Sequence, residues 1–284
     1  MGLTVIPAKD FDELVNSVSE ARRHPFSYSE MLDSHSSTYQ DIKKYMKTTN
    51  VAKIGEGTAR VAYFMPPGSV PSDKSCPSCL KVARNKKGIG QNGAEIKLFD
   101  DYGSKYSCFP EMYEWDRRND FFLFTEVGKP IVDKADNPLV DLPAWAKEWN
   151  HALGLDKYKT TKALEKQLSI NPDELDETDF LLHTSETADV TTSIVDICQT
   201  LHDDEDGYAD KMFEHIKSKV SRFKKYDGVL SLMKFAMDGG TEILNFLDFK
   251  YNTPNWAIVL RNGVETLLPI DFGFTWDVIN TYYR

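Results

Sequence analysis

The chain has 284 residues, a net charge of −10 and a hydrophobic share of 41%. This length suits one compact unit of two parts with an extension, and the apolar share is enough to bury a core. The acidic balance argues against general nucleic-acid binding, which needs a basic surface. The sequence has no run of about 18 apolar residues and no secretory signal at its start, so we expect a cytoplasmic protein without a membrane span.

Residues 1–50 are predicted to form a helical extension. Phe11, Leu14 and Val18 recur at spacings of three and four, which places them on one face of an amphipathic helix. We expect this extension to pack on the neighbouring part of the chain. It contains no group of residues that indicates catalysis.

A glycine-rich turn is predicted between two short strands, at residues 51–54 and 61–65. The turn spans residues 55–60 and contains Gly55 and Gly57. Because glycine has no Cβ, such a turn lets backbone amides approach phosphate groups closely. A single Gly-x-Gly is also common in ordinary tight hairpins, so its meaning depends on the residues that follow.

The next predicted strand, residues 79–83, carries Lys81 between apolar neighbours. Burial of an unpaired ammonium group is costly, so Lys81 needs an anionic partner. Glu95 is the candidate, because it lies 14 residues further on in a segment with a helical pattern, residues 93–99. The sequence therefore predicts an ion pair between a strand and a helix.

Cys76 and Cys79 have the spacing of half a zinc knuckle. A structural zinc site needs four ligands, and the sequence has no second Cys-x-x-Cys pair. We therefore favour a simple turn before the strand of Lys81, and metal binding by the two cysteines is the open alternative.

Two further strands, residues 112–115 and 121–125, are predicted to form a hairpin that ends at Glu126. After this hairpin the patterns become helical, and Pro143 suits a first helical turn. The predicted helices span residues 142–153, 160–168, 186–203, 208–226 and 228–247.

The charge is uneven within this helical region. Residues 171–210 contain 13 Asp and Glu and no Lys or Arg, whereas residues 211–225 contain six Lys or Arg and one Glu. We interpret the acidic block as a solvated insert beside a basic helix. The alternative is an interaction surface that attracts a basic partner.

The end of the sequence predicts a hairpin with polar residues at its strand ends. An Asn-Gly pair between residues 256–259 and 267–270 is a strong hairpin signal. Asn255 precedes the first strand, and Asp271 begins an Asp-Phe-Gly after the second. An amide oxygen and a carboxylate on neighbouring strand ends are suited to bind Mg²⁺.

The order of these features resembles the protein-kinase-like superfamily: a glycine loop, a strand lysine, a helix glutamate, an asparagine and an Asp-Phe-Gly. The Gly-x-Gly-x-x-Arg-x-x-Tyr pattern and the Asn-Trp pair look most like the divergent kinase-like proteins of tailed bacteriophages. The resemblance covers about residues 51–128 and 244–274. It implies an α+β, bilobal kinase-like fold.

In that fold, residues 51–128 would form the small N-lobe, an antiparallel sheet with one helix. Residues 129–284 would form a mainly helical C-lobe that contains the acidic insert and the hairpin, preceded in the chain by the extension of residues 1–50. Only 11 residues follow Gly273, so we expect no activation segment of the usual kinase kind. Docking of a protein substrate would have to come from elsewhere.

The resemblance also implies ATP as a ligand. Lys81 would contact the α- and β-phosphates, and Glu95 would orient Lys81. Gly55 and Gly57 would lie over the phosphates. Glu126 would lie where a kinase hinge binds adenine through its backbone.

Asn255 and Asp271 would hold Mg²⁺, and the position of the catalytic base departs from the kinase spacing. Kinases place a catalytic Asp five residues before this Asn, where the chain has Lys250, and Asp248 lies seven residues before it. Asp248 would accept the proton of a substrate hydroxyl, with Lys250 as a charge-stabilising neighbour. Both residues are predicted to lie in a loop before Asn255. Alternatively, Asp248 is an ordinary loop acid and the protein is a pseudokinase.

Two functions therefore follow from the resemblance. The first is a Mg-ATP-dependent phosphotransferase, an atypical Ser, Thr or Tyr protein kinase that can phosphorylate itself. The second is a pseudokinase that acts as an interaction module, with a host protein as its partner and the host cytoplasm as its location if the chain is phage-encoded. A small-molecule kinase is less favoured, because such enzymes keep the Asp five residues before the Asn.

Overall fold

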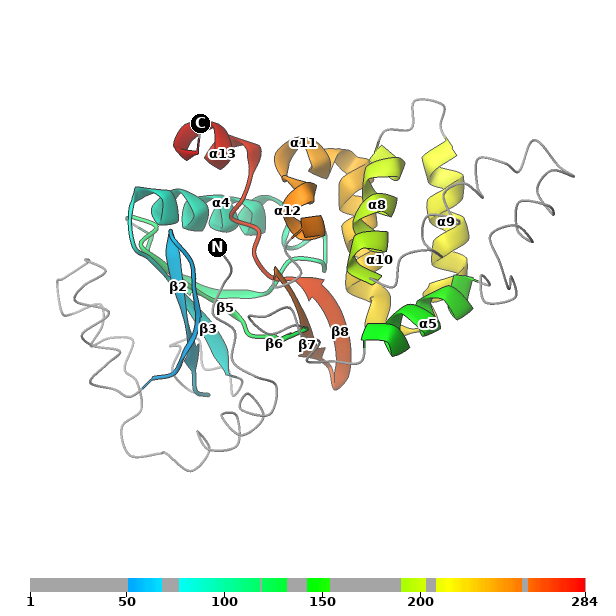
Figure 1. The fold of residues 1–284 in the computed structure, drawn as a ribbon, viewed down its shortest axis with the longest axis horizontal. Coiled ribbons are helices and arrows are strands. Elements are labelled where there is room, and N and C mark those ends of the chain that lie inside the picture. The colour runs from blue at the N-terminus through cyan, green and yellow to red at the C-terminus, as the bar shows by residue number, and fades with distance from the viewer. Residues whose placement is uncertain are drawn as a thin grey trace, which may run out of the picture.

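The computed structural model describes residues 51–67, 77–117, 119–131, 142–153, 190–202, 208–251 and 255–283. In these residues the protein is α+β, with two antiparallel sheets and several helices (Figure 1). The extension predicted over residues 1–50, the helix predicted at 160–168 and a large part of the acidic block lie outside the described residues.

The larger sheet has five antiparallel strands in the order β1-β2-β3-β5-β4. The bounds of its strands are β1 Lys53–Glu56, β2 Arg60–Met65, β3 Ser78–Ala83, β4 Met112–Trp115 and β5 Phe122–Glu126. Helix α4, Lys86–Tyr102, connects β3 to β4 and runs along the sheet (Figure 1). The predicted strands and the predicted single helix of this region are therefore present.

Helix α4 begins earlier than the sequence pattern predicted, because Asn85 caps it. The Asn85 side-chain oxygen accepts hydrogen bonds from the amides of Lys87 at 3.0 Å and Gly88 at 3.2 Å. Gly88 also allows close packing, since an added Cβ would lie 2.1 Å from the carbonyl oxygen of Ala59. The start of α4 and the glycine-rich turn are thus held in direct contact.

The smaller sheet has three strands in the order β6-β7-β8. Its strands are β6 Lys129–Pro130, β7 Trp256–Arg261 and β8 Val264–Pro269. Between β7 and β8, Asn262 and Gly263 have φ values of 52° and 78°, and two positive φ values are typical of a type I′ turn. The predicted Asn-Gly hairpin is confirmed.

The remaining elements are helical. Their bounds are α5 Leu142–Leu153, α8 Val190–His202, α9 Tyr208–Val220, η2 Lys224–Tyr226, α10 Asp227–Phe235, η3 Ala236–Gly240, α11 Thr241–Ile243, α12 Phe246–Tyr251 and α13 Trp276–Tyr282. The continuous helix predicted over residues 228–247 was wrong, because the π-helical turn η3 contains Gly239 at a φ of 93°. None of the described helices is long and apolar enough to span a membrane.

The largest core cluster lies among these helices and the β7–β8 hairpin. It includes Phe272 of the Asp-Phe-Gly, whose ring centroid lies 4.7 Å from that of Phe109 and 5.2 Å from that of Phe249. Burial of an aromatic ring stabilises the fold by about 2 kcal/mol or more. This packing fixes the backbone at Asp271, the residue before it.

Candidate functional site

Lys81 in β3 and Glu95 in α4 form the ion pair that the sequence predicted. The Lys81 ammonium lies 3.0 Å and 2.8 Å from the two carboxylate oxygens of Glu95. It also donates a hydrogen bond to the carbonyl oxygen of Ile270 at 2.7 Å. The buried Lys81 ammonium therefore contacts both helix α4 and the segment after β8.

Arg60, the first residue of β2, adds a second cation to this pair. Its Nη1 lies 2.6 Å from Oε1 of Glu95, and its Nη2 contacts Oδ1 of Asp271. Nη1 also donates to Oδ1 of Asn92 at 3.3 Å. Only 8% of the Arg60 side chain is exposed, so its guanidinium bridges the two carboxylates inside the protein.

We call Arg60, Lys81, Glu95 and Asp271 the charge cluster. Its two cations balance its two carboxylates, as burial of charged groups requires. Burial alone would raise the pKa of Asp271, but the neighbouring Arg60 and Lys81 outweigh it and lower the pKa to about 2. Asp271 is therefore ionised at neutral pH and carries the negative charge that pairs with the Arg60 guanidinium.

Gly273 leaves the room that Arg60 needs. A Cβ at this position would lie 3.0 Å from Nη2 of Arg60 and 2.8 Å from Cβ of Gln91. The Gly273 amide also points to Asp271, with 3.4 Å between its nitrogen and Oδ1. The glycine of the Asp-Phe-Gly thus allows α4 and the charge cluster to approach the chain after β8.

Tyr283, just after α13, is a site residue that the sequence pattern did not reveal. Its hydroxyl accepts a hydrogen bond from Gln91 at 3.2 Å, and the ammonium of Lys87 lies 4.2 Å from its ring centre. Burial raises the pKa of Tyr283, Arg60 opposes this effect, and Asp271 adds to it. The end of α13 therefore lies beside the charge cluster.

Asp248 and Asn255 are brought together, with the amide nitrogen of Asn255 donating to Oδ2 of Asp248 at 2.7 Å. Asp248 lies in helix α12, not in the loop that the sequence predicted. The indole of Trp256 donates to the carbonyl oxygen of Phe249 at 3.0 Å and fixes α12 against β7. Lys250 also belongs to α12, but its side chain lies outside the described residues.

The residues predicted to hold Mg²⁺ do not form a ready site for it. Asn255 donates its amide nitrogen to Asp248, and Asp271 uses Oδ1 for the Arg60 guanidinium. Within the described ranges, no three His, Cys, Asp or Glu side chains gather as metal ligands. A divalent cation at Asp271 would have to compete with Arg60 for the carboxylate.

The two glycines of the predicted phosphate loop have different positions. Gly55 is part of β1 and pairs with Ala62, so it lies in the strand and not in the turn. Gly57 opens the turn, and its amide donates to the carbonyl oxygen of Arg60 at 2.9 Å. The carbonyl oxygen of Gly57 in turn accepts from Arg84 at 2.7 Å, which ties the turn to the end of β3.

Glu126 has a structural partner that the sequence did not indicate. Its carboxylate binds Arg261 of β7, with Nη2 2.6 Å from Oε2 and Nε 3.1 Å from Oε1. Its amide donates to the carbonyl oxygen of Glu111 at 2.7 Å. Binding of adenine near Glu126 stays a prediction.

Cys79 lies buried in β3, and this burial raises the pKa of its thiol to about 11. Cys76 lies outside the described residues, so the proposed half knuckle is not seen as a unit. A buried neutral thiol in the middle of a sheet is typical of packing and not of metal binding.

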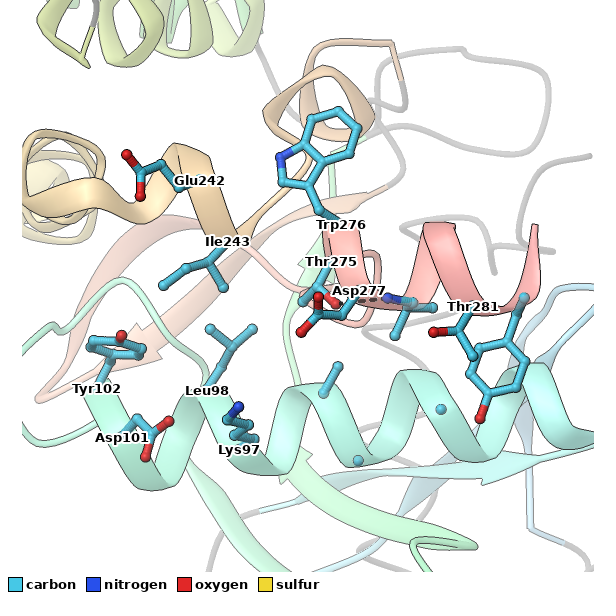
Figure 2. Close-up of a pocket in the computed structure, with 15 residues that line it drawn as sticks. Lys97, Leu98, Asp101, Tyr102, Glu242, Ile243, Thr275, Trp276, Asp277 and Thr281 are labelled. Atoms are coloured by element: carbon cyan, nitrogen blue, oxygen red, sulfur yellow. Dashed lines mark hydrogen bonds between the residues drawn. The ribbon is translucent and has the colours of Figure 1, made fainter. Parts of the chain in front are cut away.

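A separate cavity of about 510 Å³ lies between α4, α11 and α13 (Figure 2). Its walls carry Lys97, Asp101, Glu242, Trp276 and Asp277. No side chain of the charge cluster lines it. The cavity and the charge cluster are therefore separate features that share no residue.

Comparisons with protein-family models and with curated proteins find no match for this chain. A functional assignment therefore depends on how these side chains are arranged.

Proposed function

We propose that this chain is a kinase-like protein that binds ATP at the charge cluster and transfers the γ-phosphoryl group to a Ser, Thr or Tyr hydroxyl. One observation carries the proposal: the Lys81–Glu95 ion pair lies beside Asp271, next to a glycine-rich turn. Protein kinases use a strand lysine, a helix glutamate and an Asp-Phe-Gly aspartate in this combination to position a nucleotide triphosphate.

The arrangement of the sheet supports a kinase-like small lobe over residues 51–128. The single helix α4 enters between β3 and β4 and carries Glu95 toward the central strand β3. Residues 129–284 would then form the second lobe. The proposed nucleotide would lie where the five-stranded sheet meets the segment after β8.

The chemistry would use Asp248 as the proton acceptor. The substrate hydroxyl oxygen would attack the γ-phosphorus, the bond from that phosphorus to the bridging oxygen of ADP would break, and Asp248 would take the hydroxyl proton. The hydrogen bond from Asn255 fixes the direction of the Asp248 carboxylate. Positioning and charge neutralisation supply most of the rate of such a transfer.

A pseudokinase is the second candidate, and the contact between Arg60 and Asp271 favours it. This contact uses the carboxylate that a kinase offers to metal. In that case the protein would bind a nucleotide without transfer and act through a protein partner. For a chain of bacteriophage origin, which the sequence resemblance suggests, the partner would be a host protein.

Incubation of the purified protein with γ-labelled ATP and Mg²⁺, alone and with a host lysate, separates the two functions. Label that is lost in Lys81→Met and Asp248→Asn, and kept in the surface control Asp210→Asn, would support transfer. A rise in Tm with ATP and no label would support the pseudokinase. If the protein shows no label and no rise in Tm, both proposed functions are contradicted.

A further inference from the structure

Arg60 is held at the carboxylate where the sequence predicts a metal ion. Its guanidinium contacts Asp271 and lies 2.6 Å from Glu95, so it occupies the space between the two acidic groups. The room for it is made by Gly273, where a Cβ would come within 3.0 Å of Nη2. The packing at Gly273 thus leaves room for the positive charge of Arg60 between Glu95 and Asp271.

A guanidinium can take over the electrostatic part of a metal ion's role. It stays charged at all physiological pH values, and it binds phosphate oxygens in a planar fork. It has five N–H groups. Its contacts with described residues are two from Nη1, to Glu95 and Asn92, and one from Nη2, to Asp271. The Nε–H and one N–H of Nη2 make no hydrogen bond with the described residues, and a phosphate oxygen would reach them at the 8% of the side chain that is exposed.

The second cation of the cluster lies next to this one. Lys81 and Arg60 both contact Glu95, so the ammonium and the guanidinium are separated by a single carboxylate. The carboxylates of Glu95 and Asp271 balance these two cations. A phosphate group that approaches Asp271 would meet both cations and would be attracted by them at close range.

We propose that Arg60 is the resident cation of this site and binds the nucleotide phosphates beside Asp271, so that ATP binding needs no divalent cation. This inference rests on the proposed nucleotide site. It adds a phosphate-binding role for Arg60, a residue that replaces the third glycine of the kinase loop.

The test is calorimetric titration with a non-hydrolysable ATP analogue, once in EDTA and once in Mg²⁺. For the unaltered protein we expect the two Kd values to agree within about threefold. For Arg60→Gln we expect binding in EDTA to weaken by about tenfold or more, with recovery in Mg²⁺ because Asp271 is then free for the metal ion. Arg60→Lys keeps the charge but lacks the planar fork, so its Kd in EDTA should lie between that of the unaltered protein and that of Arg60→Gln.

Each other outcome overturns the inference in a distinguishable way. If the unaltered protein binds the analogue in Mg²⁺ but loses it in EDTA, the inference fails and the proposed function stands. If Arg60→Gln binds as well as the unaltered protein in EDTA, Arg60 has only a structural role. Absence of binding in both solutions would overturn the nucleotide site itself. Should Arg60→Gln not fold, the unaltered protein and Arg60→Lys still decide the question.

Discussion

Two arginines join the five-stranded sheet to the rest of the protein, and their surroundings differ. Arg261 binds the carboxylate of Glu126 and donates to the backbone carbonyl oxygens of Ser107 and Phe109. Arg60 binds only side chains among the described residues, two of them carboxylates. Backbone carbonyls are fixed by the fold, whereas carboxylate side chains can turn toward a ligand.

The two ion pairs therefore have different roles: the Arg261 pair stabilises the fold, and we propose that the Arg60 pair belongs to a ligand site. Arg261 pairs with the largely buried Glu126 carboxylate and donates to the carbonyl oxygens of the buried Phe109 and the exposed Ser107, which is a structural task. Arg60 lies in a cluster that contains a second cation, Lys81, and an acid with a lowered pKa, Asp271. Perturbed acids beside paired cations are typical of functional sites.

The largest expected effect belongs to Arg261→Met, which removes the structural ion pair. The change leaves the Glu126 carboxylate without its cation and two carbonyl oxygens without a donor, so we expect the free energy of unfolding to fall by about 3 kcal/mol. Urea denaturation measures this loss. The control is Arg222→Met, since Arg222 is exposed and stacks on Phe223. Equal losses in the two variants would contradict the structural role of Arg261.

The pH dependence of stability tests the pairing of Asp271 in the charge cluster. The pKa of Asp271 is lowered to about 2 in the folded state, so the unfolded state binds more protons near pH 3. This contribution is complete above pH of about 4 and disappears as the pH falls toward about 2, with a size of roughly 2 kcal/mol. Asp271→Asn should flatten the stability curve in that interval, as followed by urea denaturation at several pH values. An unchanged slope would show that Asp271 is not paired in the folded state.

Gly273→Ala tests whether Arg60 depends on the space left by this glycine. The new Cβ would press on Gln91 and on Nη2 of Arg60, so we expect a loss of about 1 kcal/mol in stability. Nucleotide binding in EDTA should weaken as well. Gly57→Ala is the control for stability, because a Cβ there meets nothing closer than 3.8 Å. Full stability of Gly273→Ala would mean that the cluster is not tightly packed.

The smallest expected effect belongs to Tyr283→Phe. The change removes the acceptor for Gln91 and should lower the free energy of unfolding by about 0.5 to 1 kcal/mol. Thermal or urea unfolding measures it. The matched control is Tyr282→Phe, since the Tyr282 hydroxyl has no hydrogen-bond partner in the described part of the chain. A larger effect from Tyr282→Phe would show that α13 is held by other contacts.

Local rules predicted some of the fold and part of the site. The turn at Asn262 and Gly263 follows from two positive φ values that these residues tolerate, and it was predicted correctly. The pairing of Lys81 with Glu95 follows from the cost of a buried ammonium. By contrast, the predicted start of α4 was late, because glycines in its first turns hide the helical pattern that the Asn85 cap begins.

The predicted loop position of Asp248 failed for a tertiary reason. Helix α12 is only six residues long, and contacts of Phe249 with Trp256 and Phe272 hold it in place. Short helices have little stability of their own, so packing decides whether they form. A local sequence pattern does not contain information about that packing.

Sequence patterns predicted the strands of the five-stranded sheet, the Asn-Gly hairpin and the need of Lys81 for an acidic partner, because each depends on near neighbours or on the burial cost of one group. The contact of Arg60 with Asp271, 211 residues away in the chain, is seen only in the folded protein. No spacing rule connects such distant residues, since their meeting depends on the packing of Phe272 and on the space at Gly273.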